Sequence, residues 1–130
     1  MLTLRPLDDC FAGGKLRTVE PSYEKACQSI ALARAYLDEA RQSGAIGTTR
    51  LAMNGLYFAW FHAGRSVLFA DGIREKSHYC LEQYLGTYVS AGKLDARWLL
   101  LFSRMRKRLR TASTRSVPRL SPTRSRVFLT

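Results

Sequence analysis

The chain has 130 residues, a length that fits one domain. Its 21 Lys and Arg residues outnumber its 10 Asp and Glu residues, but every acid lies before position 104. Residues 1–103 are therefore nearly neutral and residues 104–130 strongly basic, which excludes a uniformly cationic domain. A localised basic block favours contact with nucleic acid, an acidic partner or an anionic membrane surface.

The cysteines are Cys10, Cys27 and Cys80, odd in number, widely spaced and without a CxxC pair. This pattern predicts neither a disulfide framework nor a thiolate zinc site, and it fits a reducing cytosol. The first ten residues contain two acids and no apolar run, so we expect no signal peptide. We expect a cytoplasmic protein with no cofactor and no metal.

Residues 1–20 are predicted to form an irregular arm, because Pro6 and the pair Gly13-Gly14 break regular structure. The first helix should begin near Pro21-Ser22, end near Ser43 and be capped by Gly44. Apolar residues recur in it three and four positions apart, as on one face of a helix. They are Tyr23, Ala26, Ile30, Ala33, Leu37 and Ala40.

A second helix should start at Thr48 or Thr49 and end at Gly72. It is apolar on nearly every face, which predicts a central position. Its residues 51–70 approach the length of a membrane span, but Asn54, His62 and Arg65 would be costly in lipid, which favours a buried core helix.

Two more helices are predicted, one from Ser77 to Gly92 and one from Asp95 to about Leu109. Short connections favour antiparallel neighbours, and no segment alternates with the period of a strand. The sequence therefore predicts an all-α fold, an up-and-down antiparallel bundle of four or five helices spanning residues 21–112. Residues 113–130 have the composition of a disordered basic tail, or of a segment whose native reading frame has been lost.

Three polar residues interrupt the apolar second helix. His62 and Arg65 share one face, and Asn54 points in nearly the same direction as Arg65. One interpretation is a polar pocket in the bundle that binds an anion such as phosphate through Arg65. The alternative is a satisfied buried network or a dimer contact that sets register.

Arg74 and His78 stand close together, with Lys76 between them. An Arg beside a His suits phosphodiester cleavage, with the His as acid or base and the Arg on the developing charge. Basic residues are also common at solvent-facing helix starts, so the pair has a simpler explanation.

The end of the last helix carries five cations that would attract phosphates in a salt-dependent way. They are Arg104, Arg106, Lys107, Arg108 and Arg110. The alternative is a solvated helix end whose cations complement the helix dipole.

Residues 22–112 resemble the HEPN domain (higher eukaryotes and prokaryotes nucleotide-binding), in its small stand-alone prokaryotic branch. The segments that carry the likeness are YEKACQSIALARAYLDEA, then NGLYFAWFHAGRSVLFADGIREKSH, then the turn GKLD at Gly92–Asp95. The resemblance implies an antiparallel helical bundle, commonly a homodimer, often paired with a minimal nucleotidyltransferase in a toxin–antitoxin-like system.

Many members of that family cleave RNA with an Arg and a His separated by a short spacer near the final helices. This chain departs from that pattern, because no His follows His78. An Arg-x-x-Ala-Asp-Tyr signature of this branch is also broken, since Ala112 is followed by Ser113-Thr114. We therefore expect a binding module for nucleotide or RNA rather than a catalyst.

In this reading Asn54, His62 and Arg65 line the ligand site, and Arg74, Lys76 and His78 border it. Two alternatives stay open. One is an RNA-cleaving toxin that uses Arg74 and His78. The other is an adaptor bundle that binds only protein.

Overall fold

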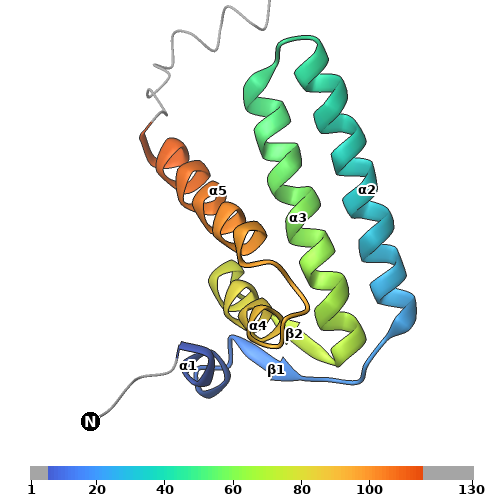
Figure 1. Ribbon diagram of the computed structural model, residues 1–130, viewed down its shortest axis with the longest axis vertical. Coiled ribbons are helices and arrows are strands. Elements are labelled where there is room, and N and C mark those ends of the chain that lie inside the picture. Colours follow the sequence, from blue (N-terminus) through green and yellow to red (C-terminus); the bar gives the residue numbers. More distant parts are fainter. Residues whose placement is uncertain (1–5, 116–130) are drawn as a thin grey trace, which may run out of the picture.

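The computed structural model describes residues 6–115, with side chains as far as Thr111. Its elements are α1 (Pro6–Ala12), β1 (Leu16–Thr18), α2 (Tyr23–Ala45), α3 (Thr49–Asp71), β2 (Ile73–Glu75), α4 (His78–Ser90) and α5 (Ala96–Arg115). Figure 1 shows α2 and α3 side by side over their whole length, with α4 and α5 on the other side of α3. This arrangement confirms the predicted all-α bundle.

The long α2–α3 hairpin is held together by small residues. Ala26, Ser29, Ala33 and Ala40 are buried on α2, and Gly55 and Ala59 are buried on α3. A Cβ on Gly55 would lie 3.0 Å from the Ala40 Cβ, so the two helix backbones approach closely. The opposite face of α3 packs on the other helices, where Gly64 lies against Leu81 of α4 and Tyr57 stacks on Phe102 of α5.

Most helix ends match the sequence prediction. The Ser22 side chain accepts a hydrogen bond from Lys25 N, and the Ser77 side chain accepts one from Cys80 N. Gly72 ends α3 in the left-handed conformation, at φ 76°. The first hairpin helix runs two residues beyond the predicted end, to Ala45, so Gly44 lies inside it rather than capping it. Likewise α5 continues past Leu109 to Arg115, and the rest of the predicted tail lies outside the described residues.

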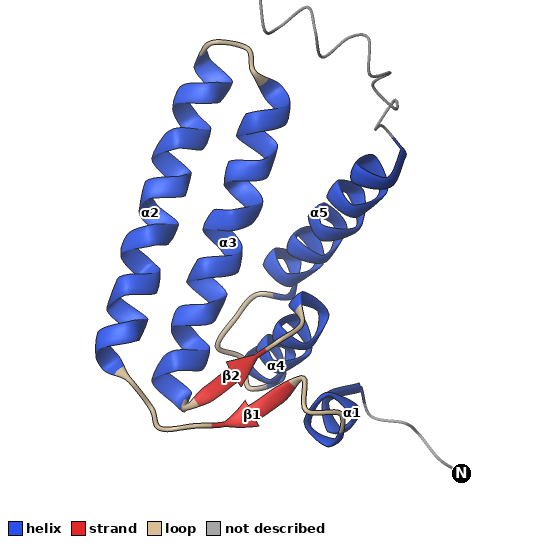
Figure 2. Cartoon of the chain, turned by 180° about the vertical axis from the view of Figure 1, so that it is seen from behind, coloured by secondary structure: helices blue, strands red, loops and turns tan. Residues whose placement is uncertain are grey.

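The expectation of an irregular N-terminal arm is wrong over residues 6–18. This segment forms α1 and β1, and β1 pairs antiparallel with β2, placing Leu16 opposite Glu75 and Thr18 opposite Ile73 (Figure 2). Each strand has three residues, too few to show a period-two pattern. Their pairing depends on a partner far away in the sequence, which local reasoning does not reveal.

The expectation about the cysteines is also wrong. Cys10 of α1 and Cys80 of α4 form a disulfide, with Cα atoms 5.7 Å apart and 70 residues between them in sequence. Cys27 is a free, exposed thiol. The count and spacing of cysteines carry no information about proximity in space, so only the fold brings this pair together.

None of the helices among the described residues is long and apolar enough to cross a membrane.

The close packing of α3 against α2 can be tested by a substitution. Gly55→Ala should lower the free energy of unfolding by about 1–2 kcal/mol, because its Cβ meets Ala40 Cβ at 3.0 Å and Tyr36 O at 3.3 Å, groups that cannot rotate away. Urea unfolding followed by circular dichroism measures the change.

Gly86→Ala in α4 is the matched control. Its Cβ would meet no heavy atom within 4 Å, so it should stabilise the protein by up to about 1 kcal/mol through helix propensity alone. Equal stabilisation by both substitutions would contradict the close approach of α2 and α3.

Candidate functional site

The first candidate site is a hollow bordered by α2, α3, β2 and the segment that follows β1. Its volume is about 520 Å³, and Lys25, His62, Arg65 and Arg74 all line it. We call it the cationic hollow, although Glu20 also lines it. Two uncharged polar side chains, Gln28 and Ser29, complete its polar wall. Three cations around one hollow of this size can receive a phosphate or another small anion.

Arg65 is held in place at the edge of this hollow. Its Nε donates a hydrogen bond to Glu75 Oε1 at 3.0 Å. Its guanidinium carbon lies 5.3 Å from the ring centroid of Phe69 and 5.6 Å from that of Phe61. A guanidinium has further N–H donors beyond Nε, so the ion pair orients Arg65 without using up its capacity to bind an anion.

His62 contributes a neutral ring to the hollow. Burial lowers its pKa below the usual value of 6.5, and the positive charge of Arg65 lowers that pKa further. The ring stacks on Tyr36, with centroids 5.5 Å apart. At neutral pH the ring therefore offers one donor and one acceptor rather than a charge.

Asn54 does not belong to this group. It is exposed and lies eleven residues before Arg65, which is roughly 16 Å along the axis of α3. The two side chains share a direction but lie too far apart to reach one ligand group. Lys76 is also exposed and does not line the hollow.

His78 lies in a second hollow, of about 360 Å³, between the start of α4 and the middle of α5. We call it the α4–α5 hollow. Arg106 and Arg110 line it together with His78 and Tyr57. Arg74 and His78, paired in the sequence interpretation, thus line different hollows, and the arginines that share a hollow with His78 come from the last helix.

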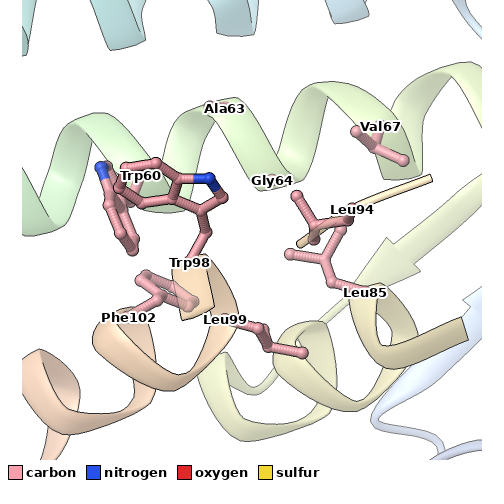
Figure 3. A pocket seen from close by; sticks show the side chains of 9 residues that line it. All are labelled: Trp60, Ala63, Gly64, Val67, Leu85, Leu94, Trp98, Leu99 and Phe102. Atoms are coloured by element: carbon pink, nitrogen blue, oxygen red, sulfur yellow. The ribbon is translucent and has the colours of Figure 1, made fainter. Parts of the chain in front are cut away.

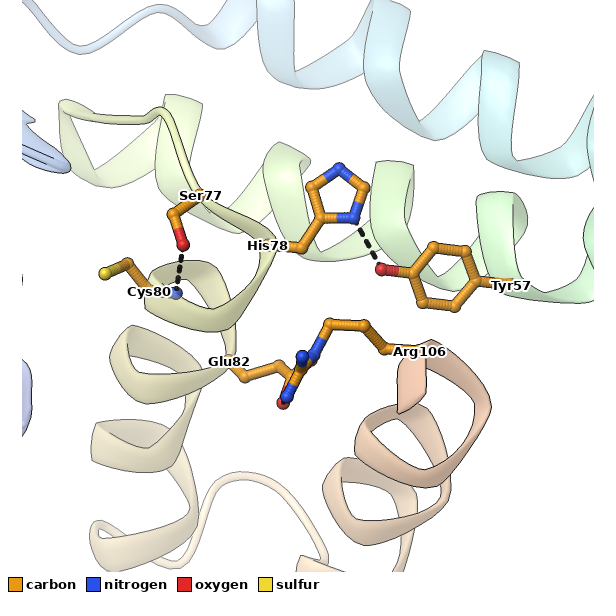
Figure 4. Close-up of polar contacts among 6 residues, drawn as sticks. All are labelled: Tyr57, Ser77, His78, Cys80, Glu82 and Arg106. Carbon is orange, nitrogen blue, oxygen red and sulfur yellow. Dashed lines mark hydrogen bonds and ion pairs between the residues drawn. The ribbon is translucent and has the colours of Figure 1, made fainter. Parts of the chain in front are cut away.

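Tyr57 and His78 form a hydrogen bond whose polarity can be assigned. The Tyr57 oxygen lies 2.6 Å from His78 Nδ1 (Figure 4). Burial raises the pKa of Tyr57 to about 12, and burial lowers the pKa of His78. Both groups are therefore neutral at pH 7, so the Tyr57 hydroxyl donates, Nδ1 accepts, and the proton of the ring is on Nε2.

Beneath this pair, Arg106 of α5 forms an ion pair with Glu82 of α4 (Figure 4). The two side chains are only 14% and 4% exposed. Arg106 therefore differs from the other four predicted nucleic-acid contacts, because its charge is already matched inside the protein. The sequence signal for this pair was Glu82, an acid that follows Leu81 in an otherwise apolar stripe. A buried carboxylate needs a cation as its partner.

The other cations of α5 point outward. Arg104, Lys107 and Arg108 are exposed, and Arg110 is exposed at the rim of the α4–α5 hollow. Within the described part of the chain, no carboxylate forms an ion pair with Arg104, Lys107 or Arg108. Their positions place all three on one face of the helix.

A third hollow, of about 410 Å³, is apolar and was not predicted. Trp60, Gly64 and Val67 of α3 line one side of it, and Trp98, Leu99 and Phe102 of α5 line the other (Figure 3). The Trp98 side chain is 52% exposed at its mouth. Such a surface suits an apolar side chain of a partner better than a charged ligand.

Among residues 6–111, no three His, Cys, Asp or Glu side chains come together as a metal site requires.

Comparison with known proteins gives one match. The model of the HEPN domain matches residues 27–118, well over half of the chain, a segment that includes most of α2 and all of α3, α4 and α5. No curated protein matches, and no solved structure matches. Helix α1 and strand β1 precede the matched segment.

The buried ion pair can be tested directly. Glu82→Gln should lower the free energy of unfolding by about 3 kcal/mol, because it leaves the Arg106 charge buried without a partner. Urea unfolding at neutral pH measures the loss.

Asp38→Asn serves as the control, since it breaks the Asp38–Arg41 pair whose side chains are 68% and 72% exposed. This control should change stability by less than about 0.5 kcal/mol. A loss for Glu82→Gln no larger than that would mean that Arg106 reaches water.

Proposed function

The chain belongs to the HEPN domain family, and we propose that it is a binding module that holds RNA or a nucleotide through the outward face of α5 and the cationic hollow. The observation that carries the proposal is the set of exposed cations on α5. From Ala96 onward the chain contains no Asp or Glu, so nothing acidic in this helix opposes an approaching phosphate.

The two cationic surfaces suit different parts of such a ligand. The α5 face presents Arg104, Lys107 and Arg108 along a helix, an arrangement that fits successive phosphates of a strand. The cationic hollow gathers three cations from α2, α3 and β2 around one small volume, which suits a single phosphate group. No aromatic residue lies between Ser103 and Arg110, so we expect little base stacking and little sequence preference on the α5 face.

Binding through α5 predicts a defined salt dependence. The triple variant Arg104→Gln/Lys107→Gln/Arg108→Gln should weaken binding of a labelled single-stranded RNA and reduce the slope of log affinity against log salt by about 2, since each phosphate contact contributes about 0.7. Fluorescence anisotropy over a range of salt concentrations measures both quantities.

The matched control removes the same charge elsewhere, at three exposed arginines of α2 and α3. These are Arg34, Arg41 and Arg50. An equal effect of the two triple variants would show a general response to net charge and contradict a site on α5. Failure of the wild-type chain to bind RNA at all would favour the adaptor that binds only protein.

A ribonuclease is the second candidate. The neutral His78 ring lies in the α4–α5 hollow beside two arginines. Its Nδ1 could accept a proton from a ribose hydroxyl once the Tyr57 hydroxyl, which donates to Nδ1 in the structure, has turned away. The RNA from the binding assay, run on a denaturing gel, tests this possibility. Cleavage that disappears in His78→Ala would support it, and intact RNA would speak against it.

We also propose that the chain acts in the cytoplasm as a homodimer and pairs with a nucleotidyltransferase-type protein, as in toxin–antitoxin-like systems. The family resemblance motivates this partner. The apolar hollow supports a protein contact, because Trp98 at its mouth is half exposed and Leu101 on the next turn is 43% exposed.

Capture of partners by the tagged chain from its host, with and without nuclease, tests the pairing. A nucleotidyltransferase-type protein should be retained in stoichiometric amount after nuclease, and Trp98→Ala should release it. Leu51→Ala, which alters an exposed leucine at the far end of α3, should leave the partner bound. Retention of RNA alone, lost after nuclease, would contradict the pairing.

Sedimentation equilibrium of the chain by itself measures the proposed homodimer.

A further inference from the structure

The disulfide joins the N-terminal arm to the helical domain. We define the arm as residues 6–18, which contain α1 and β1 and precede the segment that matches the family. Cys10 on the arm is 3% exposed, and Cys80 in the first turn of α4 is 4% exposed. The bridge therefore attaches an additional element to α4 two residues after His78.

The bridge borders a surface hollow of about 270 Å³. Both cysteines line it, together with Pro6, Asp9, Lys15 and Tyr79. Because both cysteines line this surface hollow, we expect a small dithiol to reach the bridge from this side. Lys15 lies in the same hollow, and a nearby cation stabilises the thiolate that leaves when a disulfide is attacked, against the opposing effect of the Asp9 carboxylate.

Besides the bridge, the β1–β2 ladder and the packing of Leu7 and Leu16 on the core hold the arm. Strands β1 and β2 have three residues each, and a two-stranded ribbon of that length is not stable by itself. Two backbone hydrogen bonds extend the ladder, from Val19 N to Gly72 O and from Lys76 N to Lys15 O, both 2.8 Å. Leu16 is buried and anchors the strand. Loss of the bridge should shift the arm toward release rather than unfold the bundle.

Strand β2 links the arm to the cationic hollow. Arg74, which lines that hollow, pairs across the ladder with Arg17, and Glu75, which holds Arg65, pairs with Leu16. Strand β1 is the only sheet partner of β2 among the described residues. Release of β1 therefore removes the ladder that positions Arg74, a lining residue of the hollow, and Glu75, the residue that orients Arg65.

We propose that Cys10–Cys80 is a redox modification site, reduced by a dithiol, and that its reduction loosens β1 from β2 and so changes the geometry of the cationic hollow. The effect on ligand binding, and only that effect, rests on the proposed anion-binding function. A disulfide in a reducing compartment is expected to be transient or regulatory, which agrees with the proposed cytoplasmic location.

The reaction is thiol–disulfide exchange. One thiolate of the dithiol attacks a sulfur of the bridge, forms a mixed disulfide and expels the other cysteine as a thiolate, which takes up a proton. The second thiol of the reductant then loses its proton and attacks the mixed disulfide, which releases the remaining cysteine. Two electrons pass from the dithiol to the protein, leaving two protein thiols and an oxidised, cyclic reductant.

Hydrogen exchange on the full chain tests the proposal. In a Cys27→Ser background, dithiothreitol without denaturant should yield two alkylatable thiols. The amides of Val19 and Lys76 should then exchange about tenfold faster or more, while the amide of Ala59 inside α3 keeps its rate. Cys10→Ser/Cys80→Ser should show the fast rates with and without dithiothreitol.

Three results would overturn the proposal: a bridge that dithiothreitol cannot open in the folded protein, unchanged rates at Val19 and Lys76 once it is open, or equal acceleration at Ala59. Titration with inorganic phosphate then separates this inference from the proposed function. If the oxidised chain does not bind phosphate, anion binding in the hollow fails while the exchange rates still decide the redox site. Equal phosphate affinity in both redox states would overturn the coupling.

Discussion

The buried Glu82 carboxylate is the constraint on which the arrangement of the last two helices depends. A carboxylate removed from water needs a cation within reach, and Arg106 of α5 supplies it. Once Arg106 faces α4, the helical repeat turns Phe102 and Met105 into the core and leaves Arg104, Lys107 and Arg108 outward. One buried charge in α4 thus orients the cationic face of a different helix.

Both hollows hold a neutral histidine, His62 in the cationic hollow and His78 in the α4–α5 hollow. Burial lowers the pKa of both His62 and His78, and nearby arginines lower both further, against the raising effect of Glu75 and Glu82 on His78. A protonated ring in either place would add a cation beside Arg65 or Arg106. The chain therefore combines permanent cations, which attract phosphate at any physiological pH, with neutral rings that can exchange protons. Because the groups that attract phosphate and the groups that can exchange protons are different, the chain can bind an anion without catalysing a reaction on it.

Local signals in the sequence were sufficient for the four helices from α2 to α5, because caps such as Ser22, Gly72 and Ser77 and the apolar repeats act over a few residues. They did not predict the short α1. They were not sufficient for β1, β2 or the disulfide, since each depends on a partner more than fifty residues away. At the candidate site, helical spacing correctly placed His62 and Arg65 on one face. It did not exclude Asn54, because direction around a helix says nothing about distance along it. The proximity of His78 to Arg106 depends on how α4 packs against α5, which no local pattern encodes.

The two cationic surfaces differ in what supports them. The α5 face belongs to a helix that core residues and the Glu82 ion pair hold in place. The cationic hollow takes Arg74 from β2, a short strand paired with β1 of the arm, and Glu75 of that strand also orients Arg65. Loosening of the arm would therefore act on the cationic hollow through the β1–β2 ladder, whereas it would reach α5 through the Cys10–Cys80 bridge and the Glu82–Arg106 ion pair. If one ligand contacts both surfaces as proposed, its contact in the hollow is the one that depends on the pairing of β2 with the arm.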